Sequence, residues 1–412
     1  MQNKKIILIG DDIRQPTGVG NILKSISLKL SNEYDIVQIA AGLQPNEVID
    51  LSDSVSKVTG NDSVYFKLYG TNDYGSLELL RNVIKTETAD CILIMTDPHK
   101  FEWLFKSEHE IRSICPIFYY HVWDNKPYPQ FLKRYYDSCD TISCISKLTH
   151  ECVRNIVPDH PRVFYTPHGV DTHMYQPQTE STITKNRNDF LGQDYKFVLF
   201  FNGTNIPRKE ITTIIAGFND FYHKLNTDDK KEVTLLIHSN SKSTRGVNIN
   251  ALLDDLYTDL PVLLSDEIVN EQVLNNMYNL SHCVINISSS EGFGLSTLES
   301  VATKTPIIVN KTGGLIDQIN EKWTYPITPD FSLMRGTQTT PYIYSDYVSI
   351  ESTSNAIMSA FKNKSPSMDS YLEFLKENKF TSDDMCQSVC DQVDQTISSY
   401  ETPSRYKFEK IK

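Results

Sequence analysis

The sequence lacks the features that would place the protein in a membrane or on a nucleic acid. No run approaches the roughly 18 apolar residues of a membrane-spanning helix, and the apolar run at residues 6–9 is too short for the core of a signal peptide. Lys and Arg together number 40 against 52 Asp and Glu, so the formal net charge is −12. A field of that sign does not attract nucleic acid. These absences predict a cytoplasmic protein without a membrane span.

Metal-binding and redox motifs are also missing. None of the eight cysteines belongs to a C-x-x-C pair, and the two that share a helical spacing, Cys386 and Cys390, do not make a metal site by themselves. Most of the others lie in apolar segments such as CILIM and TISCIS, which predicts buried, reduced thiols. No G-x-G-x-x-G follows the first apolar strand, which argues against an enzyme that uses NAD.

The chain is long enough for two hydrophobic cores, because 412 residues exceed what a single core usually organises. It opens with an apolar strand at residues 5–9, a Gly-containing loop and a helix from about residue 21 to 30, the beginning of a Rossmann-like unit. Strand-like runs separated by helical patterns then predict a parallel sheet covered on both faces, with strands at residues 35–40, 91–95, 117–120, 141–145 and 162–165.

A polar segment without periodicity, QPQTESTITKNRND, begins at Gln176 and is interpreted as an interdomain linker. The alternation of strand and helix then restarts, with strands predicted at residues 197–201, 233–238, 262–264, 283–287 and 306–309. We therefore predict an α/β protein with one domain at residues 1–176 and a second at residues 190–380. A helical tail at residues 381–412 is expected to pack back on the first domain.

The segment with the most chemical information is SSSEGFGLSTLESVATKTPIIV, residues 288–309. A loop of small residues carries Glu291, and a helix begins near Leu295 and contains Glu299. The backbone N–H groups at such a helix N-terminus suit a phosphate or diphosphate, and the loop glycines let the backbone approach a ligand closely. Two carboxylates eight positions apart accept hydrogen bonds from vicinal hydroxyls, which suits a polyol.

The string E-G-F-G-x4-E in this segment resembles the E-x7-E region of retaining glycosyltransferases of family four. The resemblance implies the GT-B fold, in which two Rossmann-like domains face a cleft. It also implies transfer of a hexosyl or pentosyl group from a nucleotide-diphosphate sugar, of UDP or GDP type, to a hydroxyl acceptor. By the same resemblance Glu291 contacts the donor sugar and Glu299 the ribose, and the backbone beside sugar and diphosphate belongs to Phe293, Gly294 and Leu295.

A second stretch, FVLFFNGTNIPRKE, resembles the first strand and loop of the family's second domain. When the stretch is aligned on Gly203 and Lys209, Thr204 occupies the position of the family's usual Arg, which is a departure from the pattern. Arg208 beside Lys209 is expected to supply the second cation instead. Fixed cations stabilise the negative charge that develops on a departing diphosphate, so these two residues are the predicted catalytic cations.

Two further positions in the first domain resemble the family. His121, just past a predicted strand, corresponds to the family's histidine beside the reacting sugar, with a satisfied structural histidine as the alternative. Gly18 belongs to the T-G-V-G loop, which the resemblance places near the donor phosphates. The acceptor is expected in this domain, along loops and an aromatic set made of Trp123, Tyr128, Tyr135 and Tyr136.

The sequence has no Asp-x-Asp, the metal-binding signature of the other large glycosyltransferase fold, so we expect catalysis without a metal or other cofactor. Other functions remain open: an inactive sugar-nucleotide-binding subunit, favoured by Thr204, a sugar-nucleotide 2-epimerase, and a glycosyltransferase that acts on modified DNA bases. The sequence does not identify the acceptor (saccharide, lipid, protein or modified base), the donor, or the oligomeric state.

Overall fold

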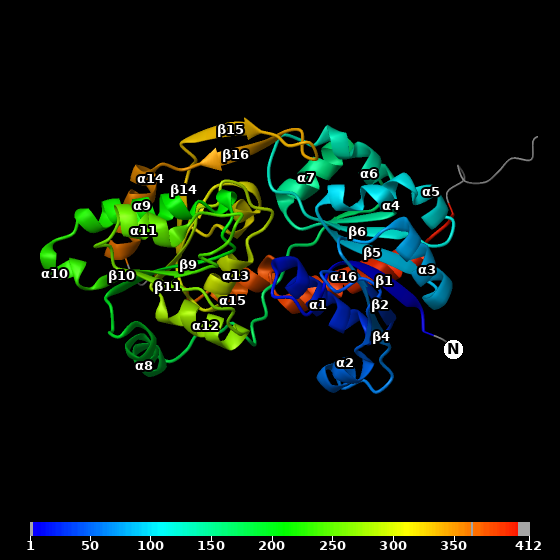
Figure 1. Ribbon diagram of the computed structural model, residues 1–412, viewed down its shortest axis with the longest axis horizontal. Coiled ribbons are helices and arrows are strands. Elements are labelled where there is room, and N and C mark those ends of the chain that lie inside the picture. The colour runs from blue at the N-terminus through cyan, green and yellow to red at the C-terminus, as the bar shows by residue number, and fades with distance from the viewer. Residues whose placement is uncertain (1–2, 364–365, 403–412) are drawn as a thin grey trace, which may run out of the picture. The chain divides into compact units, whose positions relative to one another are not determined.

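The computed structural model describes residues 3–363 and 366–402, which fold into two compact units (Figure 1). The chain starts in the first unit, forms the second, and returns to the first. The first unit consists mainly of Met1–His168 and Ser382–Lys412, and the second mainly of Gly169–Thr337 and Pro341–Thr381. The chain thus enters the second unit before the predicted boundary at residue 176.

The first unit is built on an eight-stranded sheet in the order β3-β4-β2-β1-β5-β6-β7-β8. Neighbouring strands are parallel except for the antiparallel pair β3 and β4. The central strands are apolar and buried on both faces, as expected for a parallel sheet covered by helices. The strands are β1 (Lys5–Asp11), β2 (Asp35–Ala41), β3 (Val48–Asp50), β4 (Phe66–Thr71), β5 (Cys91–Thr96), β6 (Ile117–His121), β7 (Thr141–Cys144) and β8 (Val163–Tyr165).

Helix α16 (Ser382–Ser398) closes this unit from the far end of the chain. It packs against α1, β5 and β7, and the hydroxyl oxygens of Thr396 and Thr141 lie 2.6 Å apart (Figure 1). The prediction that the C-terminal helix packs back on the first domain is confirmed. The other helices of the unit are α1 (Gly18–Leu30), α2 (Ser52–Thr59), α3 (Leu77–Glu87), η1 (Pro98–Phe101), α4 (Glu102–Lys106), α5 (Glu108–Ile111), η2 (Gln130–Leu132), α6 (Lys133–Asp137) and α7 (Lys147–Ile156).

The second unit contains a six-stranded parallel sheet in the order β11-β10-β9-β12-β13-β14 and a separate two-stranded antiparallel hairpin. Two α/β units, each built on a Rossmann-like parallel sheet, are the architecture that the sequence led us to expect. The strands are β9 (Phe197–Asn202), β10 (Val233–His238), β11 (Val262–Ser265), β12 (Cys283–Asn286), β13 (Ile307–Asn310), β14 (Thr324–Ile327) and the hairpin pair β15 (Phe331–Arg335) and β16 (Ile343–Tyr347).

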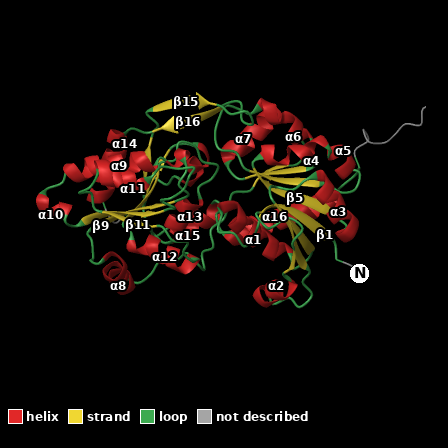
Figure 2. Ribbon diagram, viewed as in Figure 1, coloured by secondary structure: helices red, strands yellow, loops and turns green. Residues whose placement is uncertain are grey.

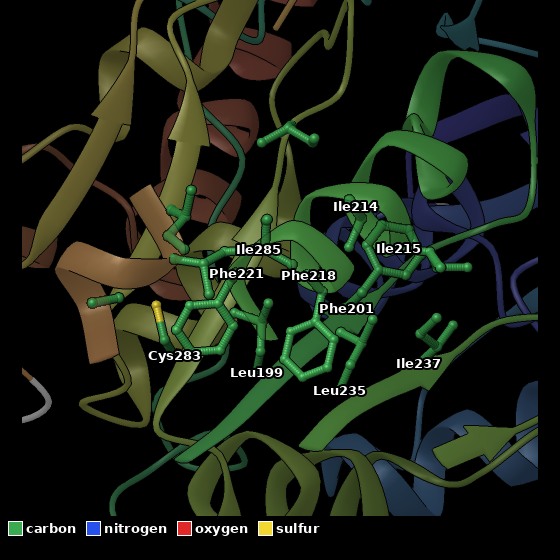
Figure 3. Close-up of a cluster of buried hydrophobic side chains, with 14 of the residues drawn as sticks. Leu199, Phe201, Ile214, Ile215, Phe218, Phe221, Leu235, Ile237, Cys283 and Ile285 are labelled. Carbon is green, nitrogen blue, oxygen red and sulfur yellow. The ribbon is translucent and has the colours of Figure 1, made fainter. Parts of the chain in front are cut away.

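Helices cover both faces of this sheet, with α9, α11 and α14 on one face and α12, α13 and α15 on the other (Figure 2). Phe218 and Phe221 of α9 enter a fully buried cluster with Leu199 of β9 and Ile285 of β12 (Figure 3). The helices are α8 (Glu180–Leu191), η3 (Pro207–Lys209), α9 (Ile211–His223), α10 (Thr227–Lys230), α11 (Ile249–Leu256), α12 (Glu271–Leu280), α13 (Leu295–Ala302), η4 (Gly313–Gln318), α14 (Ile350–Lys362) and α15 (Tyr371–Glu377).

The segment interpreted as an interdomain linker is instead largely helix α8, so that prediction was wrong. The side chain of Thr179 caps the helix by accepting a hydrogen bond from the Thr182 N–H, and Gly192 ends it in a left-handed conformation. The buried Arg187 donates from Nε to the carbonyl of Leu280 in α12, at 2.7 Å. Arg187 is the buried residue of this helix, and its apolar residues Ile183, Phe190 and Leu191 are partly or fully exposed, so no buried apolar stripe marks it in the sequence.

Among the described residues, no helix is long and apolar enough to cross a bilayer. All eight cysteines are buried, as predicted.

Candidate functional site

The site of the second unit is built around residues 288–294, the loop that joins β12 to α13. It lies at the carboxyl ends of the parallel strands, where ligands of open α/β sheets bind. The loop is buried, and residues at the ends of β12 and β13 hydrogen-bond to it. The Ser288 hydroxyl donates to Asn286 Oδ1 at 2.7 Å, and Asn310 Nδ2 donates to the Ser288 carbonyl at 3.0 Å. Its conformation is therefore fixed by neighbouring strands as well as by its own sequence.

Glu291 occupies the centre of the loop and pairs with two cations. Lys209 Nζ lies 2.5 Å and Arg208 Nη1 lies 2.9 Å from its Oε2, and the Ser288 hydroxyl lies 3.2 Å from the same oxygen. Burial of the carboxylate raises its pKa, but the charges of Arg208 and Lys209 outweigh this effect and lower the pKa to about 2. Three residues predicted separately from the sequence thus form one ionised cluster.

Backbone hydrogen bonds tie the turn that carries the cations, η3, to the glutamate loop. The Ser289 N–H donates to the Arg208 carbonyl at 2.8 Å, and Arg208 Nη1 donates to the Ser290 carbonyl at 2.9 Å. Glu210, which follows η3, adopts a left-handed backbone with φ of 54°. A non-glycine residue in this region carries strain that its surroundings must hold in place, and such residues concentrate at functional sites.

Glycines at the far side of the loop permit a close backbone approach. The Gly314 N–H donates to the Glu291 carbonyl at 2.8 Å, and a Cβ on Gly314 would lie 2.1 Å from the Gly292 carbonyl oxygen. Gly294 has φ of +93° and begins α13 at its N-terminus, where no side chain among the described residues forms a cap. The first N–H groups of α13 thus form a helix N-terminus suited to an anion.

Glu299 lies on α13 and receives a hydrogen bond from a tyrosine that the sequence did not single out. Tyr278 of α12 donates to Glu299 Oε2 at 2.5 Å, and Asn202 at the end of β9 donates to the Tyr278 oxygen at 2.9 Å. Burial raises the pKa of Glu299 to about 7, against the hydrogen bond from Tyr278 and with a smaller contribution from the charge of Glu271. Glu299 therefore changes its charge near neutral pH.

Replacing Glu299 by glutamine is expected to stabilise the free protein at pH 8 far more than at pH 5. A carboxyl whose folded pKa is raised contributes stability that is present below its unfolded pKa and is lost as pH rises through the folded value of about 7. Glutamine removes the cost of the buried charge, a gain of about 3 kcal/mol or less at pH 8. Urea unfolding at both pH values measures the difference, with the exposed Glu321→Gln as control, and an equal gain at pH 5 and pH 8 would contradict the assignment.

The predicted residues of the second unit lie at the carboxyl ends of neighbouring strands β9 and β12 and in the adjoining helix. The Gly203 carbonyl accepts a hydrogen bond from the Ser239 hydroxyl at 2.6 Å, and Thr204 beside it is exposed. Phe293 is buried, with its ring 5.7 Å from that of Phe380. This unit contains nine of the predicted positions: Gly203, Thr204, Arg208, Lys209, Glu291, Phe293, Gly294, Leu295 and Glu299.

The other two predicted residues belong to the first unit. His121 ends β6 and is fully buried, with Nε2 2.8 Å from the Tyr136 hydroxyl oxygen and its ring centroid 4.7 Å from that of Tyr119. Burial lowers the pKa of His121 to about 3, so the ring is neutral at physiological pH. Gly18 is the first residue of α1, next to Thr17, whose hydroxyl oxygen accepts a hydrogen bond from the Gly20 N–H at 2.9 Å.

The aromatic residues expected to line an acceptor site are mostly part of the core, so that prediction was wrong for three of them. Trp123, Tyr135 and Tyr136 are buried, and Trp123 Nε1 donates to the Asn125 carbonyl at 2.6 Å. Tyr128 is partly exposed and donates to Glu151 at 2.5 Å. Aromatic rings fill a core as readily as they stack on a ligand, and composition alone does not separate the two uses.

Comparison with known proteins identifies glycosyltransferases as relatives of this chain. The model of a family described as Family 4 Glycosyltransferase in conflict systems matches residues 142–367. An uncharacterised glycosyltransferase of Methanocaldococcus jannaschii is 27% identical over 207 residues, covering 47% of this chain and 49% of the relative. The D-inositol 3-phosphate glycosyltransferase of Pseudarthrobacter chlorophenolicus is 28% identical over 168 residues, covering 40% and 38%. The chain thus matches half or less of the length of these relatives.

Among solved structures, HepE of Anabaena in complex with UDP and glucose superimposes with a TM-score of 0.70 at 14% identity. The match covers 95% of this chain and 100% of HepE. At that identity the likeness establishes the fold alone.

Proposed function

Because the chain belongs to the family 4 glycosyltransferases of conflict systems, we propose that it moves a sugar from a nucleotide-diphosphate sugar to a hydroxyl acceptor, with retention at the anomeric carbon. The observation that carries this proposal is the cluster of Glu291, Lys209 and Arg208 beside the N-terminus of α13. Two fixed cations and a helix N-terminus suit a diphosphate, and a carboxylate in contact with them suits the hydroxyls of the attached sugar.

In the proposed reaction the bond between the anomeric carbon and the diphosphate oxygen breaks, and a bond to the acceptor oxygen forms on the same face. The proton of the acceptor hydroxyl passes to the departing diphosphate. Lys209 and Arg208 stabilise the charge on that leaving group, the task a divalent cation performs in metal-dependent transferases. We therefore propose that transfer needs no metal.

In the free protein Lys209 and Arg208 both pair with the single carboxylate of Glu291, and the incoming diphosphate competes with that carboxylate for them. Once the cations turn to the diphosphate, the Glu291 carboxylate is released to accept hydrogen bonds from the sugar. Glu299 is proposed to accept hydrogen bonds from the ribose. The first unit is proposed to hold the acceptor, with His121 and Gly18 as its candidate contacts to the donor.

A second candidate is a subunit that binds sugar nucleotides without turnover. Thr204 favours it, because this exposed residue stands where the resemblance predicts a further cation. Nucleotide binding without transfer to any acceptor class would support this candidate over the enzyme.

A nucleotide screen is expected to identify the donor. We expect one nucleoside diphosphate to raise the melting temperature, because a ligand at a hundredfold excess over its Kd stabilises the native state by about 2.7 kcal/mol. UDP is the first to test, since HepE was solved with it. The measurement is a thermal-shift assay with and without EDTA. The ligands are UDP, GDP, ADP, TDP and CMP and their sugar conjugates. A shift abolished by EDTA would contradict metal independence, and no shift with any nucleotide would contradict the donor site.

A further inference from the structure

The hairpin of β15 and β16 is largely exposed, yet hydrogen bonds from Asp346 connect it to the glutamate loop of the site. Every residue of β15 is exposed, including Met334 at 58%, so the hairpin adds little to the core. In its register Ser332 faces Asp346 and Leu333 faces Ser345. Asp346 carries the attachment to the glutamate loop.

Asp346 bonds to the glutamate loop and to the neighbouring turn at Thr312. Its backbone N–H donates to the carbonyl of Ser289, at 2.6 Å, just before Glu291 in the loop. Its Oδ2 accepts from the hydroxyl of Thr312 at 2.7 Å, in the turn that leads to Gly314, whose N–H donates to the Glu291 carbonyl. One aspartate therefore contacts both the glutamate loop and the turn that hydrogen-bonds to this loop.

The same residue reaches the cations through the backbone. Ser289 accepts from Asp346 and donates its own N–H to the Arg208 carbonyl, so a hydrogen-bonded path runs from the hairpin through the loop to η3. Asn310 Nδ2 donates both to the Asp346 carbonyl, at 2.8 Å, and to the Ser288 carbonyl, at 3.0 Å. Displacement of Asp346 would move the loop and the cationic turn together.

We propose that Asp346 is a positioning residue that holds the 288–294 loop and η3 in the geometry that presents Glu291, Lys209 and Arg208 to the diphosphate. The inference rests on the proposed function. The two carboxylate oxygens of Asp346 have different partners, so a role at the site can be tested separately from a role within the hairpin. Oδ2 bonds to Thr312 beside the glutamate loop, whereas Oδ1 accepts from the Ser332 hydroxyl, at 2.5 Å, within the hairpin itself.

The test is a calorimetric titration of the full chain with UDP. We expect Asp346→Ala to raise the Kd for UDP about 10- to 100-fold with unchanged stoichiometry, because the loss of a hydrogen bond to a charged group that orders the site has an effect of that size. Thr312→Val should reproduce most of the loss. Ser332→Ala and the exposed Leu333→Ser should leave the affinity unchanged, and Asp346→Asn, which keeps a side-chain oxygen, should restore most of it.

Stoichiometry detects an irreversibly misfolded fraction, which lowers the number of sites and leaves their Kd unaltered, whereas reversible unfolding raises the apparent Kd only by the reciprocal of the folded fraction, which urea unfolding of the variant measures. The inference is overturned if Asp346→Ala binds UDP like the wild type, or if Ser332→Ala weakens binding as much as Thr312→Val. Hydrogen exchange of the free protein tests it without any ligand. Faster exchange of the amides of residues 288–294 in Asp346→Ala, and not in Ser332→Ala, supports it, and equal exchange overturns it.

If the wild type binds no nucleotide, the proposed function fails, and the exchange experiment still decides whether Asp346 orders the loop.

Discussion

Lys209→Ala is expected to lower turnover about 10²- to 10³-fold, the effect of removing one group that stabilises a developing negative charge in a closed site. The same change should weaken UDP binding, because the ammonium group is proposed to contact the diphosphate in the ground state as well. The side chain is only 12% exposed, so solvent does not substitute readily for it. Steady-state kinetics with the donor identified by the nucleotide screen measure the first effect, and calorimetry with UDP measures the second.

The matched control for Lys209 is Lys231→Ala, a lysine of the same unit whose side chain is 72% exposed. Its turnover and UDP affinity should equal those of the wild type. Wild-type turnover in Lys209→Ala would remove this residue from the catalytic assignment. Loss of turnover with unchanged UDP affinity would restrict its role to the transition state.

Glu291→Gln is expected to lower turnover by a similar factor, about 10²- to 10³-fold, while UDP affinity is kept or increased. The carboxylate pairs with Lys209 and Arg208 in the free protein, and the neutral amide competes less with the diphosphate for them. The two substitutions should therefore both lower turnover, but only Lys209→Ala should lower the affinity for UDP. A structural ion pair that binds no ligand predicts no such difference in UDP affinity.

Stability measurements accompany the Glu291 experiment, with Glu321→Gln as the control at an exposed carboxylate. The folded pKa of Glu291 is lowered to about 2, so its stabilising effect is present above the unfolded pKa and is lost as pH falls through the folded value. Glu291→Gln should lose about 3 kcal/mol at pH 7, and the deficit should shrink as the pH approaches 2. A deficit that does not vary with pH, or reduced UDP binding by the folded variant, would contradict the assignment.

The alternation of apolar strands and helices was enough to predict two α/β units from the sequence, and it located most strands within a residue or two. It also placed Arg208, Lys209 and Glu291 after strand ends, where parallel sheets gather functional side chains. The pairing of these residues depends on β9 and β12 being neighbours in the sheet. Strand order is a tertiary property, so local pattern does not reveal it.

Sequence analysis did not identify two residues of the site, Tyr278 and Asp346, and the reason is the same for both. Tyr278 belongs to the last turn of helix α12, and Asp346 to an irregular Thr- and Tyr-rich segment. Each is a single polar residue that reaches the site only through folding, and nothing in its local sequence distinguishes it from a solvated side chain. The structure identifies Tyr278 by its hydrogen bond to Glu299, and Asp346 by its hydrogen bonds to Ser289 and Thr312.

The return of the chain to the first unit has a consequence for synthesis on the ribosome. The second unit is nearly continuous in sequence, between Gly169 and Thr381, whereas the first needs α16 to cover α1, β5 and β7. Domains ordinarily fold in the order in which they emerge. Here the first unit is synthesised first but cannot complete its fold until α16 has been made. The apolar surface that α16 covers therefore stays exposed to solvent while more than 200 residues of the second unit are added. A chain cut before Ser382 should therefore retain a folded second unit and expose an aggregation-prone first one.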